Sequence, residues 1–205
     1  MLLHKFRTPL IALLLMWLSG CATTPRVPQP VNEQLWKQQQ QQLGQLTHWQ
    51  LVGRISIQLE KEAWSASLYW TQEGDNYTLR IVAPLGRGTI EISGNKDSVK
   101  LHTADNRLLE DKDVDILMQQ NLGWKIPVAA LIYWIRGLPD PQMAISQIQL
   151  EQPGHLASIN QSGWNVSYEQ YTRVGALELP SRMTIVREQL KLRLSINKWT
   201  MTDES

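Results

Sequence analysis

Residues 48–60, HWQLVGRISIQLE, set the pattern that predicts the fold. Every odd position from Trp49 to Leu59 is apolar or glycine, and every even position is polar except Val52. A period of two residues is typical of a strand with one face buried and the other in water. The stretch therefore predicts a long strand at one surface of a sheet.

The same alternation recurs along most of the chain. Turn residues, such as QEGDN at 72–76, separate the alternating runs by distances that suit hairpins. Consecutive strands are then antiparallel, and about ten or eleven strands are expected. The predicted strands include residues 49–59, 64–70, 77–83, 90–92, 99–101, 148–150, 156–159, 164–168, 183–185 and 190–196.

Three helices are also predicted. Residues 32–46 are glutamine-rich with apolar residues at helical spacing, which favours an amphipathic helix over the alternative of a low-complexity linker. A second helix is expected from the carboxylates at 111–113 to Gly123, and a third from Pro127 to Gly137. The third is apolar on nearly all sides, so it must lie against other apolar surface.

A sheet of this many antiparallel strands tends to curl, and its apolar face then encloses a space. The predicted fold class is therefore mainly β: a single-domain unclosed antiparallel β-barrel whose helices form a lid or plug over a hydrophobic cavity. The alternative is that the apolar strand residues simply pack as a core. Nine tryptophans and the apolar third helix favour the cavity.

The N-terminal segment has the features of a lipoprotein signal. Residues 1–20 combine a basic start with an apolar run of about ten residues, too short to span a bilayer. Leu18-Ser19-Gly20-Cys21 matches a lipobox, whose cysteine is acylated and becomes the new N-terminus. An incidental thiol is the alternative. We expect a cleaved signal peptide at 1–20, lipidated Cys21 with a proline-rich linker at 21–31, and one domain at 32–205.

The charge balance gives no support for a nucleic-acid partner. Without residues 1–20 the chain has 18 basic and 19 acidic residues, a formal charge of −1. It also lacks the basic stripe and the recognition motifs that nucleic-acid binding uses. Its single cysteine excludes an internal disulfide framework.

Candidate catalytic groups do not form a convergent pattern. The three histidines after the signal are far apart and are expected to be solvated, and an acidic cluster at a helix start is expected to cap it. Two Ser-x-x-Lys matches fall in a predicted turn and a predicted strand, where that serine chemistry is not found. These groups are His48, His102 and His155; Glu110, Asp111, Asp113 and Asp115; and Ser93 with Lys96 and Ser195 with Lys198.

The stretch IVAPLGRGTI, residues 81–90, places a leucine in a turn. Pro84 and Gly86 are residues of a tight reversal, so Leu85 occupies a position that is normally polar. One interpretation is that Leu85 folds back over the end of the sheet. The other is that Leu85 enters a bilayer surface locally. Burying one leucine contributes only about 1.5–3 kcal/mol, so this contact would be too weak to anchor a protein to a membrane.

Several of these segments, in this order, resemble the LolB family of outer-membrane lipoprotein receptors. The resemblance extends from the lipobox to Trp199 and leaves residues 200–205 without an assigned role. It is carried by Cys21, Trp36, Pro84-Leu85-Gly86, the segment WIRGLP at 134–139, the segment GWNVSY at 163–168, and Trp199.

The resemblance implies an unclosed barrel with helices over its mouth, no enzymatic activity, and no cofactor apart from the diacylglycerol and N-acyl lipid on Cys21. It also implies a lipid-anchored, periplasm-facing monomer at the outer membrane. Such a protein accepts lipoproteins from the periplasmic carrier LolA, holds their acyl chains and inserts them into the inner leaflet. Ala22 suits this sorting, since aspartate there is the usual retention signal for the inner membrane. The family's exposed turn leucine implies a membrane-insertion role for Leu85, presented by Pro84 and Gly86.

On this basis the wall of the hydrophobic cavity is expected to include Ile55, Ile57, Trp70, Leu79, Ile81, Ile90, Ile92, Trp134 and Ile135. Arg87 and Arg136 are expected to be solvated. Two alternatives stay open at this point. One is a lipoprotein that binds amphiphiles without a carrier partner, and the other is a structural assembly lipoprotein whose indoles are simply packed.

Overall fold

The computed structural model describes residues 33–201, apart from 87, 124–125 and 152–153. The chain divides into the units 1–30 and 31–205, and the described residues belong to the second. The predicted signal peptide, Cys21, the linker and Arg87 lie outside the described residues. None of the described helices has the length and apolar content needed to cross a membrane.

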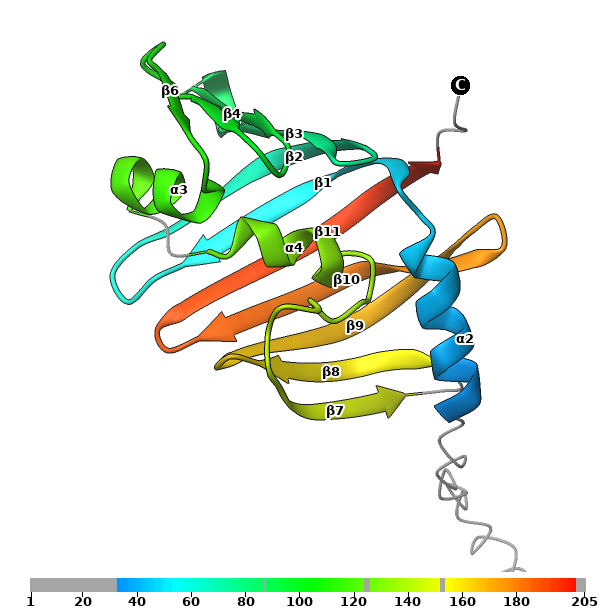
Figure 1. Cartoon of the computed structure of the whole chain (residues 1–205). Coiled ribbons are helices and arrows are strands. Elements are labelled where there is room, and N and C mark those ends of the chain that lie inside the picture. The colour runs from blue at the N-terminus through cyan, green and yellow to red at the C-terminus, as the bar shows by residue number, and fades with distance from the viewer. Residues whose placement is uncertain (1–32, 87, 124–125, 152–153, 202–205) are drawn as a thin grey trace, which may run out of the picture. The chain divides into compact units, whose positions relative to one another are not determined.

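One sheet of eleven strands forms the framework (Figure 1). Its order is β6-β5-β4-β3-β2-β1-β11-β10-β9-β8-β7, and every neighbouring pair is antiparallel. The strands are β1 His48–Gln58, β2 Ala63–Glu73, β3 Asn76–Val82, β4 Thr89–Gly94, β5 Val99–His102, β6 Leu108–Asp111, β7 Ile145–Glu151, β8 His155–Gln161, β9 Trp164–Val174, β10 Leu177–Arg187 and β11 Leu190–Met201.

The sheet is not closed, because β6 and β7 are its two edges. This confirms the predicted unclosed antiparallel architecture. The sequence did not predict β6, since its residues LLED show no period of two. The predicted strand around Ile148 exists as β7, but it is an exposed edge strand, in which Ile148 is 37% exposed.

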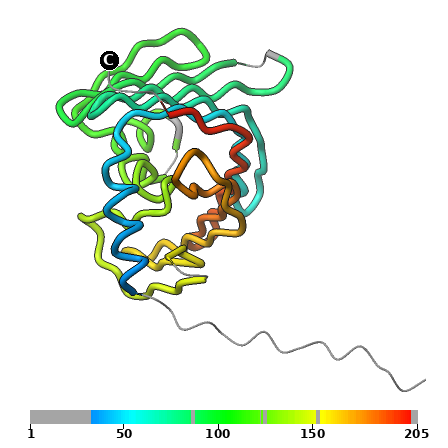
Figure 2. The backbone as a smooth tube through the Cα atoms, turned by 90° about the vertical axis from the view of Figure 1, so that its right-hand side faces the viewer, coloured from blue at the N-terminus to red at the C-terminus, as the bar shows by residue number. Residues whose placement is uncertain are grey.

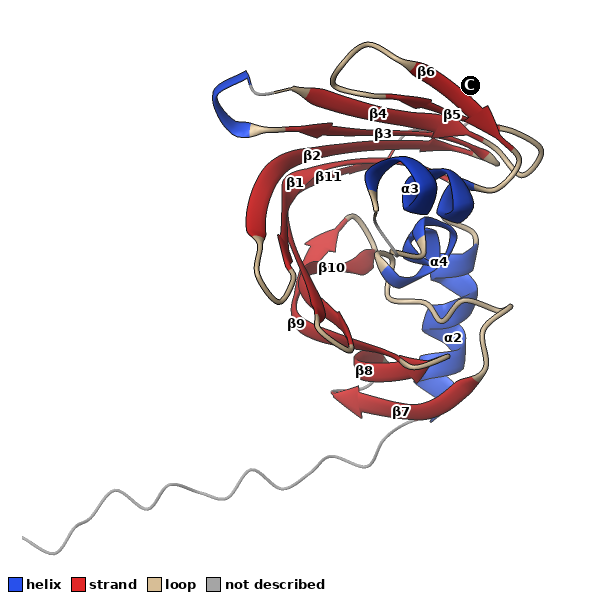
Figure 3. Ribbon diagram, turned by 90° about the vertical axis from the view of Figure 1, so that its left-hand side faces the viewer, coloured by secondary structure: helices blue, strands red, loops and turns tan. Residues whose placement is uncertain are grey.

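The central strands bend around the inner face of the sheet (Figures 2 and 3). A register shift in the β1–β11 pair lies between Val52 and Gly53. A Cβ atom on Gly53 would lie 2.4 Å from the backbone oxygen of Ser195, so only glycine fits at this bulge. Val52, the residue that interrupts the sequence alternation, lies on the outer face and is 39% exposed.

Three α-helices accompany the sheet: α2 Glu33–Gly44, α3 Val114–Leu122 and α4 Val128–Trp134. The glutamine-rich segment is therefore helical, with Trp36 and Leu43 buried. Asp113 begins α3 by accepting hydrogen bonds from the backbone nitrogens of Asp115 and Ile116, as the acidic cluster predicted. Helices α3 and α4 connect edge strand β6 to edge strand β7 and lie on the inner side of the curved sheet (Figure 3).

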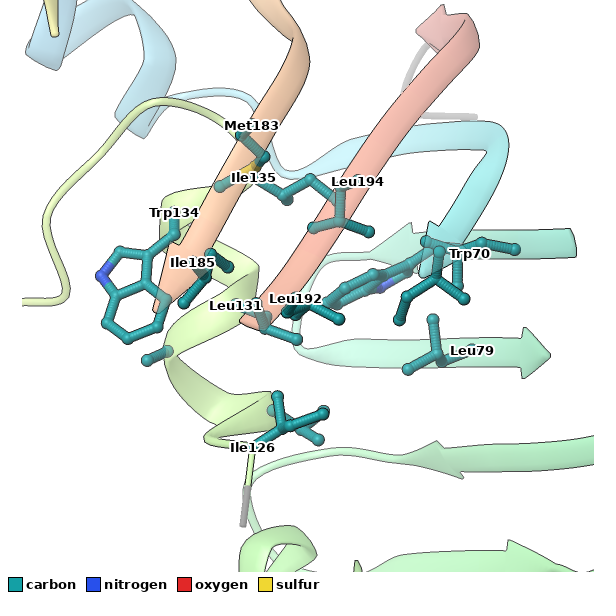
Figure 4. Packing of buried hydrophobic residues seen from close by; sticks show 14 of the residues in the cluster. Trp70, Leu79, Ile126, Leu131, Trp134, Ile135, Met183, Ile185, Leu192 and Leu194 are labelled. Carbon is teal, nitrogen blue, oxygen red and sulfur yellow. The ribbon is translucent and has the colours of Figure 1, made fainter. Parts of the chain in front are cut away.

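The core lies between α4 and the inner face of the sheet. Figure 4 shows Leu131, Trp134 and Ile135 of the α4 segment together with residues of strands β10 and β11. The strand residues labelled there are Trp70, Leu79, Met183, Ile185, Leu192 and Leu194. The apolar helix predicted from the sequence is thus covered by the sheet, and it in turn covers the sheet.

Candidate functional site

The predicted wall residues gather on one side of the sheet. Eight of the nine are between 0% and 5% exposed and belong to one hydrophobic cluster, and Ile90 packs against that cluster. Strand register aligns Trp70 with Leu79 and Leu79 with Ile92 in one row. The nine residues thus lie together, and their role as the wall of a cavity stays a prediction.

Indole rings fill part of the inner face of the sheet. Among the described residues, six tryptophans are buried: Trp36, Trp49, Trp70, Trp134, Trp164 and Trp199. The ring centroid of Trp49 lies 5.5 Å from that of Trp70 and 5.3 Å from that of Trp199. The three rings thus pack together on the inner face where β1, β2 and β11 are neighbours.

Two hollows flank the helices. One, of about 690 Å³, lies by the ends of β1, β10 and β11 and includes Ile57, Ile126 and Trp164. The other, of about 770 Å³, includes Tyr77 and Tyr133. Asp115 and Met143 line both hollows, so these two residues lie where the hollows adjoin.

A buried polar network fixes the C-terminal end of α4. The indole nitrogen of Trp134 donates to Gln161 Oε1 at 2.7 Å, and the Tyr168 hydroxyl donates to the Trp134 carbonyl at 3.0 Å. Gln161 Nε2 donates to the carbonyls of Asp140 and Met143 at 2.8 and 3.1 Å. The sequence did not reveal this role, because Gln161 falls between the predicted strands 156–159 and 164–168 and its buried position depends on the fold.

Arg136 is buried, which corrects the expectation that it is solvated. It is only 7% exposed, and this burial lowers the pKa of its guanidinium. Its nitrogens donate to the carbonyls of Ile132 at 2.9 Å, Leu46 at 2.8 Å and Leu43 at 3.4 Å. Arg136 therefore ties the end of α4 to the end of α2, where free helix carbonyls need donors.

Asp115 connects α3 to the start of α4. Its Oδ1 accepts a 2.7 Å hydrogen bond from the backbone nitrogen of Val128. Burial raises the pKa of this carboxyl, and burial together with the charges of Asp115 and Asp113 raises the pKa of Tyr77 to about 12. Within the acidic cluster, Asp113 caps the N-terminus of α3, and Asp115 accepts a hydrogen bond from the first residue of α4.

The turn Pro84–Gly86 presents Leu85 to solvent. Leu85 is 93% exposed, more than any other large hydrophobic residue among those described. It does not fold back over the sheet. Its φ of 58° and ψ of 29° are left-handed, a conformation that costs a non-glycine residue about 1–2 kcal/mol.

The histidines do not converge, but one of them is not solvated as expected. His155 stacks on Tyr171 with ring centroids 4.5 Å apart, and its Nε2 lies 2.6 Å from Glu178 Oε2. His102 is exposed and His48 is half-buried. In the part of the chain that the structure describes, there is no group of three or more His, Cys, Asp or Glu residues that could hold a metal ion.

Comparison with known proteins matches residues 47–199 to the family model "Outer membrane lipoprotein LolB". The chain is 34% identical over 197 residues to an outer-membrane lipoprotein LolB from Nitrosococcus oceani, covering 95% of this chain and 98% of that protein. It is 36% identical over 199 residues to the protein of the same name from Pseudomonas syringae pv. syringae, covering 96% and 95%.

The fold is also found in a solved structure. A LolA superfamily protein from Nitrosomonas europaea superposes with a TM-score of 0.57 at 7% identity, covering 86% of this chain and 96% of that one. At this identity the likeness shows the fold alone.

Proposed function

The chain belongs to the LolB family of outer-membrane lipoproteins, and from that premise we propose that it accepts lipoproteins from the carrier LolA, holds their acyl chains, and inserts them into the inner leaflet. Family membership makes it a lipid-anchored outer-membrane protein that faces the periplasm, and a localisation receptor rather than an enzyme.

The observation that carries the proposal is the two-sided apolar contact between α4 and the sheet. Leu131 and Ile135 lie beside Leu192 and Leu194 (Figure 4), and the ring centroid of Trp134 lies 6.0 Å from that of Trp164 in β9. Hydrocarbon that separated the helix from the sheet would replace apolar contacts with apolar contacts, so the exchange costs little hydrophobic free energy. The two flanking hollows leave space for the first part of this displacement.

The polar contacts determine how the helices can move. Arg136 and the Trp134–Gln161 pair hold the C-terminal end of α4, whereas Asp115 links α3 to the N-terminal end. Helices α3 and α4 therefore swing away from the sheet as a pair, about the fixed end near Arg136. The hollow beside Ile126, where the α3–α4 connection lies, is then the first to widen.

Physical chemistry explains why a receptor is needed. At about 0.8 kcal/mol per CH₂, exposing one sixteen-carbon chain to water costs roughly 12 kcal/mol. Free diffusion of a lipoprotein through water is therefore excluded. Transfer needs no chemical step if each site along the route, with the bilayer last, binds the chains more tightly than the site before it.

Leu85 suits the final transfer. Its side chain has the exposure and the turn position needed to enter the bilayer surface beside the lipoprotein being released. Because one leucine adds little membrane affinity compared with an acyl anchor, its effect is expected on delivery and not on anchoring. Leu85→Glu should leave acceptance from the carrier intact and impair delivery.

The decisive experiment measures transfer directly. Purified carrier, verified to hold a lipoprotein, is mixed with this protein prepared without Cys21, and vesicles are then added. We expect the lipoprotein to pass to the receptor and then to the vesicles. No passage from the verified carrier would contradict the proposal, and binding of free fatty acid or phospholipid without acceptance from the carrier would favour a general amphiphile-binding lipoprotein instead.

A further inference from the structure

A separate groove lies beside the Leu85 turn, at the end of the β3–β4 hairpin that extends away from α3 and α4 (Figure 3). It has a volume of about 500 Å³. Its lining comes from β2, β3, β4 and the adjoining loops, and we call it the turn groove. The lining includes Trp64, Ala66, Ile81, Ala83, Leu85 and Ile90.

The chemistry of the turn groove differs from that of the other hollows. The two hollows beside the helices are lined in part by charged groups, such as Asp115, Arg187 and Arg136. The described lining of the turn groove contains one serine, Ser65, and otherwise only apolar residues and glycine. Such a surface offers little to a polar ligand and suits a hydrocarbon chain.

Small residues create the space. Ala66, Ala83 and Ala104 line the groove together with the large side chains of Trp64 and Ile90. The wall at Ala104 is close to the hairpin, because a Cβ atom on Gly88 would lie 2.6 Å from the Ala104 Cβ. Gly88, at φ 133°, thus lets the 103–107 loop close one side of the groove.

The floor of the groove continues the buried face of the sheet. Ile81 pairs with Ile90 and with Leu68, and the next row inward holds Trp70, Leu79 and Ile92. Ile81 is 5% exposed and belongs to the core cluster. From Leu79 to Ala83 is about 13 Å along the strand. Apolar surface is therefore continuous from the helix–sheet contact to the exposed Leu85.

We propose that the turn groove holds an acyl chain of the transported lipoprotein as that chain leaves the interior for the bilayer. This inference rests on the function proposed above and adds the route of release. Continuity with the interior favours a chain of the lipoprotein over a chain of a membrane phospholipid. Leu85, at the rim, then opens the bilayer surface where the chain emerges.

The test uses a lipoprotein whose acyl chain carries a diazirine. It is given to the full receptor by the carrier, and photocrosslinks are mapped by mass spectrometry with and without vesicles of phosphatidylethanolamine and phosphatidylglycerol. Ala83→Glu places a carboxylate in the groove. Ala63→Glu is the matched control, because Ala63 is exposed and adjoins Trp64 without lining the groove. Circular dichroism and thermal unfolding verify that both variants fold.

We expect crosslinks at residues 64–66 and 81–90 to increase when vesicles are present. Ala83→Glu should reduce those crosslinks and slow delivery about tenfold or more, since an ionised carboxylate is strongly disfavoured beside hydrocarbon. Its acceptance of the lipoprotein should not change. Ala63→Glu should behave as the wild type.

Wild-type delivery by Ala83→Glu, with crosslinks only outside the groove, would overturn the inference and leave the receptor function intact. Failure of the wild-type protein to accept the lipoprotein would instead overturn the proposed function. A second arm carries the diazirine on the vesicle phospholipid. Groove crosslinks from phospholipid but not from the lipoprotein would also overturn the inference.

Discussion

The indole nitrogen of Trp134 lies 2.7 Å from Oε1 of Gln161, and both side chains are completely buried. The bond joins the last residue of α4 to the last residue of β8. Because the same amide also holds backbone groups of Asp140 and Met143, one glutamine organises the chain from the end of α4 into the following loop.

Gln161→Leu should lower the free energy of unfolding by about 3 kcal/mol or more, because several buried donors and acceptors lose their partner at once. Urea denaturation measures the loss. Gln149→Leu is the control, since Gln149 is exposed and pairs with Ser158 at an edge of the sheet. Equal effects of the two changes would mean that the buried network contributes nothing beyond side-chain loss.

Arg136→Lys should destabilise the protein by about 2 kcal/mol, although it keeps the charge. A lysine cannot reproduce the fork that reaches the carbonyls of Leu43 in α2 and Ile132 in α4. Exposed Arg193→Lys should change the unfolding free energy by less than about 0.5 kcal/mol. Faster hydrogen exchange at the end of α2 in Arg136→Lys alone would verify the linkage between the helices.

The contributions of Asp115 and Asp105 to the free energy of unfolding should change with pH in opposite directions. The pKa of Asp115 is raised by burial, so the folded state binds its proton more tightly and stability falls as pH rises above about 3.8. The pKa of Asp105 is lowered by hydrogen bonds from Thr103 and Arg107, so its contribution is lost as pH falls through the lowered pKa.

Comparing each Asp→Asn variant with the wild type over an acidic pH series isolates these contributions. Relative to its Asn variant, the wild type should become less stable with rising pH at position 115 and more stable at position 105. The same slope at both positions would contradict the assignment. Asparagine can still accept the hydrogen bond from Val128 at position 115, so the α3–α4 contact is retained.

Leu85→Asn should separate stability from delivery. Asparagine tolerates the left-handed backbone better than leucine, so the free energy of unfolding should stay constant or rise by up to about 1 kcal/mol. Delivery of lipoprotein to vesicles should nevertheless fall. Leu108→Asn, at another exposed leucine, should deliver normally. A Leu85→Asn protein that delivers at the wild-type rate would remove the membrane role.

Periodic features were predictable from the sequence. The period of two identified most strands, Asp113 and Gly123 marked the limits of α3, and Pro84 with Gly86 marked the turn that exposes Leu85. Each of these features depends on neighbours in sequence, so a single chain reveals it.

Features that depend on distant contacts were not predictable. Arg136 looks like a surface residue until α2 supplies carbonyls from about ninety positions away. His155 likewise gains Tyr171 and Glu178 only when β8, β9 and β10 lie together. Edge strand β7 carries apolar residues that its place at the limit of the sheet leaves exposed.

The pairing of β1 with β11 has a consequence for how the domain is made. The first and last strands lie side by side at the middle of the sheet and join one meander, β1–β6, to another, β7–β11. Such long-range pairing slows folding, because loop-closure entropy is paid before the contact is gained. During export the first meander emerges with its β1 edge unpaired, a template for aggregation. The β1 edge can be covered only when Leu190–Met201 is present to pair with it.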